Sequence, residues 1–216
     1  DAYFDKIQGK EISYNNLQDI AAACDLIAEY KAPTFAVLKH NNPCGIASRA
    51  TIEEAWLAAL SSDPESAFGG ILVANRPIDK ATAEAIGNLF FEVLVAPDYD
   101  TDALTLLTQK SKRILLIQKK PIESRFTFRS VLGGVLMQET DLRSENKGDF
   151  EVVTKKQPTE DELDDFVFAQ KVAKHCKSNA VALVKDSHLL AVGIGQTSRV
   201  AALKQAIEKA QHFGFD

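Results

Sequence analysis

The chain has 216 residues, of which 45% are hydrophobic and 25% charged, and its formal net charge is −5. These values are ordinary for a globular protein with one large domain or two small ones. The negative charge disfavours generic nucleic-acid binding, which needs a basic face, although a local basic pocket can still hold an anionic small molecule. No apolar run approaches the roughly 20 residues of a membrane-spanning helix. We therefore expect no membrane, no nucleic acid and a cytoplasmic location.

The three cysteines lie far apart in the sequence and form no Cys-x-x-Cys pair, so a zinc ribbon and a thioredoxin-like motif are unsupported. An odd cysteine count without a secretory signal fits a reducing compartment. His175, His188 and His212 show no metal-ligand spacing with one another or with carboxylates. We predict no metal site, a core position for Cys24, and a helix-end position for His212.

Strand and helix patterns alternate over the first half of the chain, as in α/β proteins. Ile20, Cys24 and Ile27 repeat at helical spacing after Asn15 and Asn16, which we expect to cap the helix. A capping box at residues 51–54 begins a helix that runs to about residue 62. The remaining predicted strands lie at residues 34–38, 71–74, 93–96 and 114–117. Two further helices are predicted: one that Pro77 and Asp79 introduce and that ends near residue 90, and one from about 101 to 110. Together they predict a parallel or mixed sheet with helices on its faces.

The composition shifts between residues 141 and 156, where Asp, Glu, Lys, Ser and Asn gather, and this is the best candidate boundary. It divides the chain into units at residues 1–148 and 149–216. In the second unit, Thr159 caps an amphipathic helix that reaches about residue 173. Residues 180–185 and 189–194 predict a hairpin around residues 186–188, and a helix from about 200 to 211 closes the chain. One hairpin and two helices make a thin domain that looks unfinished.

The segment Lys39-His40-Asn41-Asn42-Pro43-Cys44-Gly45 carries most of the functional information. A strand that ends at Lys39-His40 and turns on Pro43 and Gly45 places two titratable groups at the rim of a sheet, where open α/β sheets bind ligands. Histidine exchanges a proton near neutral pH, and lysine adds a positive charge and a donor. By itself, such a pair is also typical of a strand end that only contacts solvent.

A second group of polar residues follows the predicted helix at 159–173 and precedes the last one. Ser178 and Asn179 lie between a helix and a strand, and Arg199 begins the last helix. A helix N-terminus offers free N–H groups and a positive dipole end, and arginine is a bidentate donor, so this loop can bind an anion. An ordinary helix cap with a solvated arginine fits the same residues.

The segment at 37–45 closely resembles the Lys-His signature of the AICAR transformylase domain of bifunctional purine biosynthesis proteins. Further segments match the same family in the same order, so the resemblance spans nearly the whole chain. They lie at residues 8–16, 63–70, 91–97, 153–159, 172–180 and 193–200.

The resemblance implies a cytidine-deaminase-like α/β fold: a three-layer sheet with helices on both faces, in tandem subdomains of which the second is incomplete. It implies transfer of a formyl group from 10-formyltetrahydrofolate, the co-substrate, to the 5-amino group of AICAR in IMP biosynthesis. True deaminases of this fold bind zinc through His-x-Glu and Pro-Cys-x-x-Cys motifs. Here Pro43-Cys44 has no second cysteine and no His-x-Glu occurs, so zinc chemistry is disfavoured.

The resemblance also assigns roles to individual residues. His40 corresponds to the proton acceptor, Lys39 to the group that stabilises the transition state, and Asn179 to the asparagine that orients the carboxamide and the histidine. Substrate-binding positions correspond to Arg199, Asn16, Gly69, Glu92 and Ser178, and Val200 corresponds to a position beside the folate.

The family further implies a homodimer with a shared active site and an IMP cyclohydrolase domain upstream. The chain begins with Asp1 and lacks family segments on both sides, so we expect a fragment of a longer enzyme. A truncated nucleotide-binding module that keeps the AICAR pocket but has lost catalysis is the alternative.

Overall fold

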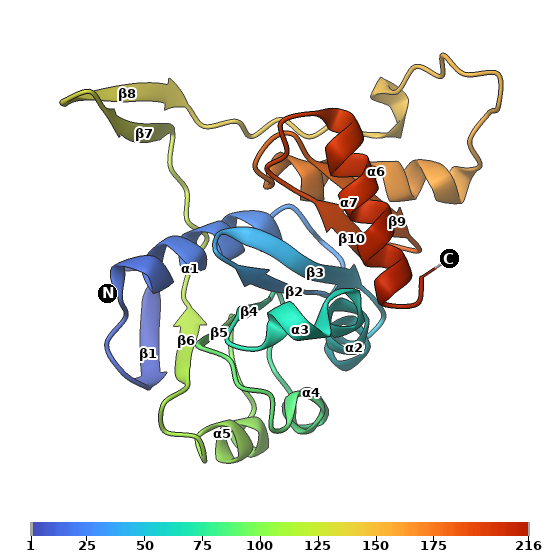
Figure 1. Cartoon of the computed structure of the whole chain (residues 1–216). Coiled ribbons are helices and arrows are strands. Elements are labelled where there is room, and N and C mark those ends of the chain that lie inside the picture. Colours follow the sequence, from blue (N-terminus) through green and yellow to red (C-terminus); the bar gives the residue numbers. More distant parts are fainter. Residues whose placement is uncertain (1, 216) are drawn as a thin grey trace.

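The computed structural model describes residues 2–215. Its strands form one eight-stranded mixed sheet and a separate two-stranded hairpin (Figure 1). The sheet order is β1-β6-β5-β4-β2-β3-β10-β9, in which the β4-β5 and β5-β6 pairs are parallel and the others antiparallel. Its strands are β1 (Phe4–Gln8), β2 (Thr34–Lys39), β3 (Asn42–Ser48), β4 (Ile71–Ala74), β5 (Val93–Ala96), β6 (Ile114–Gln118), β9 (Val181–Lys185) and β10 (His188–Gly193). The predicted α/β class is confirmed.

The helices are α1 (Tyr14–Ile27), α2 (Ile52–Ser62), α3 (Pro64–Ala67), α4 (Lys80–Ile86), α5 (Thr101–Leu107), α6 (Glu160–Lys174) and α7 (Arg199–His212), and η1 (Lys147–Asp149) is a single 3-10 turn. The predicted capping boxes at Thr51 and Thr159 are present. Helix α1 is capped by Ser13, and not by the asparagines that follow it. Helices α4 and α5 are shorter than predicted, and α4 ends where Gly87 takes a φ of +51°.

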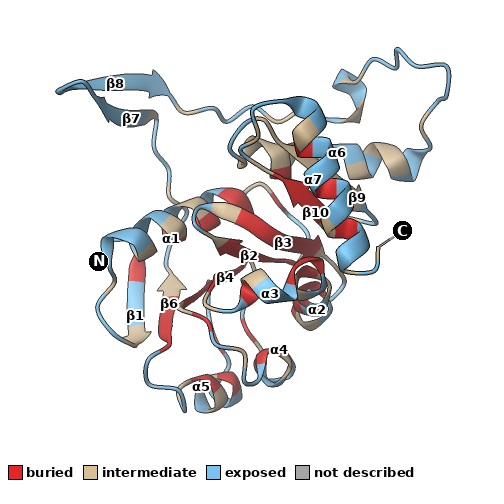
Figure 2. Cartoon of the chain, viewed as in Figure 1, coloured by how far each residue is buried: buried red, intermediate tan, exposed pale blue. Residues whose placement is uncertain are grey.

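Each face of the sheet carries its own hydrophobic cluster, as the buried residues in Figure 2 illustrate. Helices α2, α4 and α5 cover one cluster, in which Phe35 packs against Trp56 with ring centroids 5.0 Å apart. Helices α1 and α6 cover the other, which includes the predicted core residue Cys24 at 2% exposure. The central strands are buried on both faces, which explains their continuous apolar runs.

The turn of the Lys-His segment lies earlier than predicted. His40 and Asn41 form it, with φ values of +54° and +62°, and Pro43 and Gly45 lie inside β3. A two-residue turn with two positive φ values matches the twist of the flanking strands. Gly45 is required for packing and not for turning, because a Cβ atom there would lie 1.9 Å from the carbonyl oxygen of Ala59 in α2.

The order helix, strand, two-residue turn, strand, helix occurs twice, as α1-β2-β3-α2 and α6-β9-β10-α7. The second turn, Asp186–Ser187, also has positive φ values of +54° and +53°. In each copy an aspartate of the first helix accepts from turn N–H groups: Asp19 from Asn41 at 2.6 Å, and Asp165 from Asp186 and Ser187 at 2.9 and 2.8 Å. The fold therefore contains a structural repeat.

The two copies join in one sheet through β3 and β10, which pair antiparallel with His188 beside Ala47. The hairpin of the predicted second unit therefore extends the sheet of the first, and the boundary at residues 148 and 149 stays a prediction. The second copy of the repeat is also held by the ion pair between Lys209 of α7 and Asp63, which is 3% exposed. Burial alone would raise the pKa of Asp63, but hydrogen bonds from Lys209 and Ser66 outweigh it and hold the pKa below its ordinary value.

The hairpin β7 (Phe126–Val131) and β8 (Gly134–Glu139) stands away from the body of the chain and has no counterpart among the predicted elements (Figure 1). Strands β1 and β3 and helix α3 were not predicted either. Within residues 2–215, no helix has the length and apolar character needed to cross a bilayer.

Replacing Gly45 with Ala should destabilise the chain by about 2–3 kcal/mol, because the added methyl group overlaps the backbone of α2. Gly148→Ala is the matched control, since a Cβ atom there meets nothing within 4 Å. Urea denaturation followed by circular dichroism measures both. Equal stability of the two variants would contradict the close approach of α2 to β3.

Replacing Asp63 with Asn should destabilise the fold by about 3 kcal/mol at pH 7, because it leaves Lys209 without its buried partner. Folding lowers the pKa of Asp63, so its contribution is complete above the unfolded value of about 4 and is lost as the pH falls through the lower folded value. The difference between the two proteins in urea denaturation should therefore shrink below about pH 4. A difference independent of pH would contradict this account.

Candidate active site

A cleft of about 300 Å³ lies where β2 ends, and it gathers five of the nine predicted site residues: Asn16, Lys39, His40, Gly69 and Glu92. They come from α1, from the end of β2 and from the segments just before β4 and β5. The other lining residues are Lys10, Ser13, Asn15, Asp19, Leu38, Gly70 and Ile71. Sequence positions as distant as 10 and 92 therefore meet at one rim of the sheet.

Lys39 and His40 reach the cleft because β2 ends there and the turn begins. Lys39 is half-buried, and its Nζ donates to the carbonyl oxygen of Phe68 at 2.8 Å, which leaves two of its three donors for other acceptors. His40 is exposed, so its imidazole is accessible to a ligand. Its carbonyl oxygen accepts from Asn42 Nδ2 at 2.8 Å, and this bond together with that of Asp19 fixes the turn.

The opposite wall combines a carboxylate with closely packed backbone. Glu92 forms an ion pair with Lys10 at 2.6 Å, and its N–H donates to the carbonyl oxygen of Gly70 at 3.0 Å. Gly69 has a φ of +72°, a backbone conformation that favours glycine. A Cβ atom on Gly70 would lie 3.0 Å from the carbonyl oxygen of Leu38, so the backbone of this wall packs directly against β2.

Asn16 lies in the first turn of α1, where Ser13 Oγ accepts from its N–H at 3.1 Å and donates to its Oδ1 at 2.8 Å. The side chain is thus oriented at the edge of the cleft, with its Nδ2 donor group remaining for a ligand. Sequence reasoning identified Asn16 only through the family resemblance, and it overlooked Lys10 and Asp19. Lys10 lies in the family-like segment 8–16, which was the available signal.

The remaining predicted residues, Ser178, Asn179, Arg199 and Val200, do not line this cleft. Asn179 is bound to Gln196, whose carbonyl oxygen accepts from the Asn179 N–H at 3.0 Å and from its Nδ2 at 3.1 Å. Arg199 and Val200 are exposed at the start of α7, where Ser198 Oγ caps the helix by accepting from the Ala201 N–H at 3.1 Å. The predicted order of strand, loop and helix start is confirmed here.

A second hollow, of about 320 Å³, lies between the Lys-His hairpin and this region. Asn42, Pro43 and Cys44 line one side, and Lys177, Ile194 and Gly195 belong to the other. The hairpin therefore contributes to both hollows, and Asn42 links them because it also holds the carbonyl oxygen of His40.

Cys44 has neither the exposure nor the acidity of a catalytic thiol. It is 8% exposed, and burial raises its pKa to about 11, so the thiol is neutral at physiological pH. Among residues 2–215, no group of three or more His, Cys, Asp or Glu side chains is arranged to hold a metal ion.

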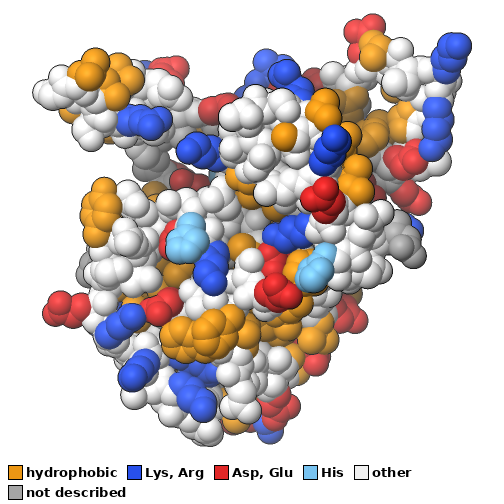
Figure 3. Space-filling view, viewed as in Figure 1, with side chains coloured by type: hydrophobic (Ala, Val, Ile, Leu, Met, Phe, Trp, Pro, Cys, Tyr) orange, Lys and Arg blue, Asp and Glu red, His pale blue; other side chains and the backbone are white. Residues whose placement is uncertain are grey.

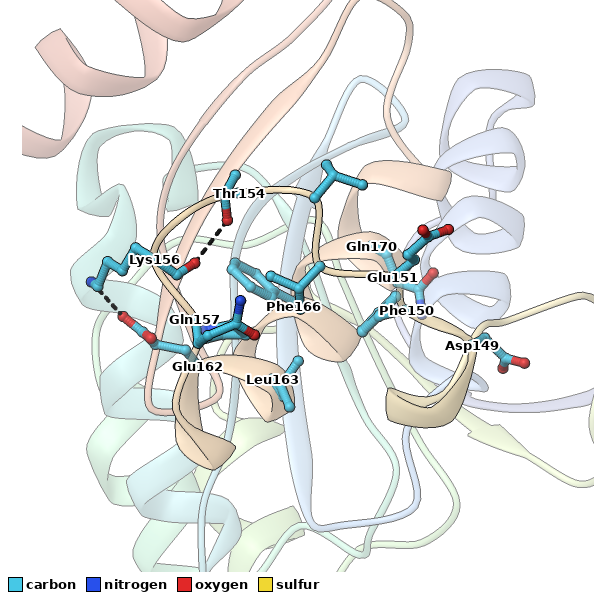
Figure 4. A pocket seen from close by; sticks show the side chains of 13 residues that line it. Asp149, Phe150, Glu151, Thr154, Lys156, Gln157, Glu162, Leu163, Phe166 and Gln170 are labelled. Carbon is cyan, nitrogen blue, oxygen red and sulfur yellow. Dashed lines mark hydrogen bonds and ion pairs between the residues drawn. The ribbon is translucent and has the colours of Figure 1, made fainter.

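A mostly apolar hollow lies elsewhere and contains no predicted site residue. It measures about 740 Å³ and is formed by residues 149–158 over α6, with Phe150, Leu163 and Phe166 among its walls (Figure 4). Two polar contacts join lining residues to one another: Thr154 Oγ1 donates to the carbonyl oxygen of Lys156 at 2.8 Å, and Lys156 forms an ion pair with Glu162 at 3.4 Å. The smaller cleft is the better candidate because it brings a histidine, two lysines and two carboxylates together.

An exposed aromatic pair flanks Gly69 at this cleft. Phe68 and Phe90 are 60% and 38% exposed, and their ring centroids lie 5.3 Å apart. The space-filling view shows histidine, basic and acidic side chains next to an apolar patch on this face of the molecule (Figure 3). Sequence reasoning singled out neither phenylalanine.

Comparison with known proteins shows the family of the chain. The sequence model of the family described as AICARFT/IMPCHase bienzyme matches residues 2–209. Proteins named bifunctional purine biosynthesis protein PurH are 59% identical over 216 residues in Bacteroides thetaiotaomicron, 46% over 217 in Chlorobium phaeobacteroides, and 44% over 213 in Persephonella marina. These alignments cover 100%, 99% and 97% of this chain but 43%, 41% and 41% of the relatives, so it spans less than half of their length. The chain belongs to the AICARFT/IMPCHase bienzyme family.

Proposed function

We propose that this chain supplies the Lys39–His40 part of an active site that transfers a formyl group from 10-formyltetrahydrofolate to the 5-amino group of AICAR, a step of purine biosynthesis. The observation that carries the proposal is the cleft, which gathers Lys39, His40, Asn16, Gly69 and Glu92 although nothing in their sequence spacing requires it. The names of the relatives support the pathway.

The reaction needs three things from the protein. The amine is attached to an electron-poor imidazole, so it requires a base as its nitrogen bonds to the formyl carbon. The tetrahedral intermediate carries an oxyanion, which requires a donor or a cation. As the bond from the formyl carbon to the folate nitrogen breaks, that nitrogen requires a proton.

His40 and Lys39 meet these needs. The exposed imidazole of His40 takes the proton of the attacking amine and returns it to the departing folate nitrogen. The ammonium group of Lys39, anchored to the carbonyl oxygen of Phe68, has donors left for the oxyanion. Both side chains come from adjacent positions at a fixed turn, so their relative placement does not depend on a flexible loop.

The remaining predicted residues complete the proposal. Asn16, Gly69 and Glu92 bind the nucleotide at the cleft, and Arg199 offers a bidentate donor for its phosphate at the start of α7. Ser178 and Asn179 act on the carboxamide side, and Val200 contacts the folate. The same proposal includes a homodimer with a shared active site and an upstream IMP cyclohydrolase domain. It also includes a reaction that uses no zinc.

A nucleotide-binding module without catalysis is the second candidate, because the chain spans less than half of its relatives. The two differ in one measurable respect. A binding module retains affinity for AICAR when His40 is replaced and shows no formyl transfer in any form, whereas the proposed enzyme loses turnover.

In the complete protein that carries this chain, His40→Ala should lower kcat for formyl transfer by about 10²-fold or more, because the reaction loses its base. His212→Ala is the matched control, since His212 is an exposed residue at the end of α7. A formyl-transfer assay, with a thermal melt to verify folding, decides the matter. Turnover close to normal in His40→Ala would remove His40 from the mechanism.

Lys39→Arg should also lower kcat, by about tenfold or more, because the broad guanidinium does not place its charge where the compact ammonium does. Lys80→Arg on the surface of α4 serves as the control. Steady-state kinetics on both variants measure the effect. Unchanged turnover in Lys39→Arg would mean that positive charge alone suffices at this position.

A further inference from the structure

A hollow of about 370 Å³ lies beside the C-terminal ends of α4 and α5, outside the cleft of the candidate active site. Its lining residues come from two segments, 88–90 and 109–113, which follow these helices. Lys110, Lys112 and Arg113 are among them, and none of the described lining residues is Asp or Glu. A chain with a net charge of −5 therefore gathers positive charge at this cationic hollow, which attracts an anion.

The basic side chains keep donors for such an anion. Lys110 and Lys112 are exposed, and within residues 2–215 neither ammonium group has a hydrogen bond or an ion pair. Arg113 is 3% exposed, and its Nη2 donates to the carbonyl oxygens of Gly87 and Leu89, each at 2.8 Å. The guanidinium is thus held at a fixed place, while the two lysines are free to reach a ligand.

Phe90 joins the cationic hollow to the cleft. It lines the hollow, its ring lies 5.3 Å from the ring of Phe68, and its carbonyl oxygen accepts from the N–H of Gly69 in the cleft at 2.8 Å. Lys39 Nζ in turn donates to the carbonyl oxygen of Phe68 at 2.8 Å. A reactive ammonium group, an exposed aromatic pair and a cationic hollow therefore follow one another along the surface. Basic side chains stand beside the apolar patch on this face (Figure 3).

One carboxylate close to the cationic hollow is already paired. The carbonyl oxygen of Glu92 accepts from the N–H of Ile114, the residue after Arg113, at 3.0 Å. The carboxylate of Glu92, however, forms its ion pair with Lys10 at 2.6 Å. Its charge is therefore compensated, and it opposes an anion in the hollow less than an unpaired carboxylate would.

The proposed co-substrate has its chemical groups in the same order. In 10-formyltetrahydrofolate, the nitrogen that bears the formyl group is attached to a benzoyl ring, and this ring carries a glutamate with two carboxylates. When the formyl group lies at His40, the benzoyl ring can contact the aromatic pair of Phe68 and Phe90, where rings pack favourably. The glutamate beyond the ring then reaches the cationic hollow.

We propose that the cationic hollow binds the glutamate carboxylates of the folate co-substrate through the ammonium groups of Lys110 and Lys112, next to the fixed charge of Arg113. This inference rests on the proposed function, from which it takes the folate. Both lysines are exposed, so each contact is weak. They are also remote from the reacting atoms, so the site raises the affinity for the folate and leaves the chemical step unchanged.

The kinetic test uses the complete protein with Lys110→Gln and Lys112→Gln combined. The KM for 10-formyltetrahydrofolate should rise by at least about fivefold with kcat unchanged, because only binding contacts are lost. The KM for 10-formyltetrahydropteroate, which lacks the glutamate, should be equal in the variant and the wild type. Lys31→Gln combined with Lys80→Gln is the matched control, since both lysines are exposed and lie outside the hollow.

Two kinetic results would overturn the proposal. One is an unchanged KM for the folate, and the other is an equal rise for both substrates, which would mean that the lysines act on the fold or on the cleft. Inorganic phosphate, added at saturating AICAR, tests the hollow as a site for a free anion. Phosphate inhibition that is relieved in the double variant, together with an unchanged KM for the folate, would assign the hollow to a free anion instead.

A lysine footprint separates this proposal from the proposed function, because it requires no turnover. Saturating 10-formyltetrahydrofolate should slow acylation of Lys110 and Lys112 by an amine-reactive ester at least about threefold, and 10-formyltetrahydropteroate should not. Lys80 is the internal control, and mass spectrometry reads all three positions. Protection without formyl transfer would support the hollow and overturn the enzymatic activity, whereas formyl transfer without protection would overturn the hollow alone.

Discussion

The pairing of β3 with β10 is the contact on which the arrangement of the protein depends. It joins two copies of one helix–hairpin–helix unit edge to edge, and polar contacts secure it on both sides. The N–H of Ser48 donates to the carbonyl oxygen of Ser187 at 2.9 Å, and Arg49 donates to that of Asp186 at 2.7 Å. Ser62 and the buried His188 lie 3.1 Å apart between α2 and β10. Burial and the charge of Arg49 lower the pKa of His188, which favours the neutral imidazole at this contact.

The two hairpin turns have the same geometry but different exposure to ligands. At Asp186–Ser187 both N–H groups bind Asp165, and both carbonyl oxygens accept from the neighbouring hairpin. At His40–Asn41 one N–H binds Asp19, and the imidazole extends toward the cleft. A left-handed backbone costs roughly 1–2 kcal/mol per non-glycine residue. In the second copy, the turn with this backbone lies at the junction of the two halves of the sheet. In the first copy, the turn with this backbone positions a histidine.

Much of the fold could be predicted from local patterns, because the central strands are buried on both faces and helices α2 and α6 begin with capping boxes. The position of the first turn could not. Glycine and proline ordinarily indicate turns, but Gly45 is required by the carbonyl oxygen of Ala59, a contact between residues 14 positions apart in sequence. The exposed β7–β8 hairpin lacks the burial that gives strands their alternating pattern, and β1 is a short edge strand.

The candidate site shows the same division between local and tertiary information. Lys39 and His40 are recognisable as adjacent polar residues at a strand end, but Glu92 became a candidate only through resemblance, since a lone carboxylate before a strand carries no signal. Its place in the cleft follows from the order of the sheet: β4 lies between β2 and β5, so the residues that flank these three strands meet at one rim. That order depends on which strands pair, a property of the assembled core. A parallel pair such as β4-β5 needs a crossover connection, here through α4, so the position of Glu92 depends on how that helix packs on the sheet.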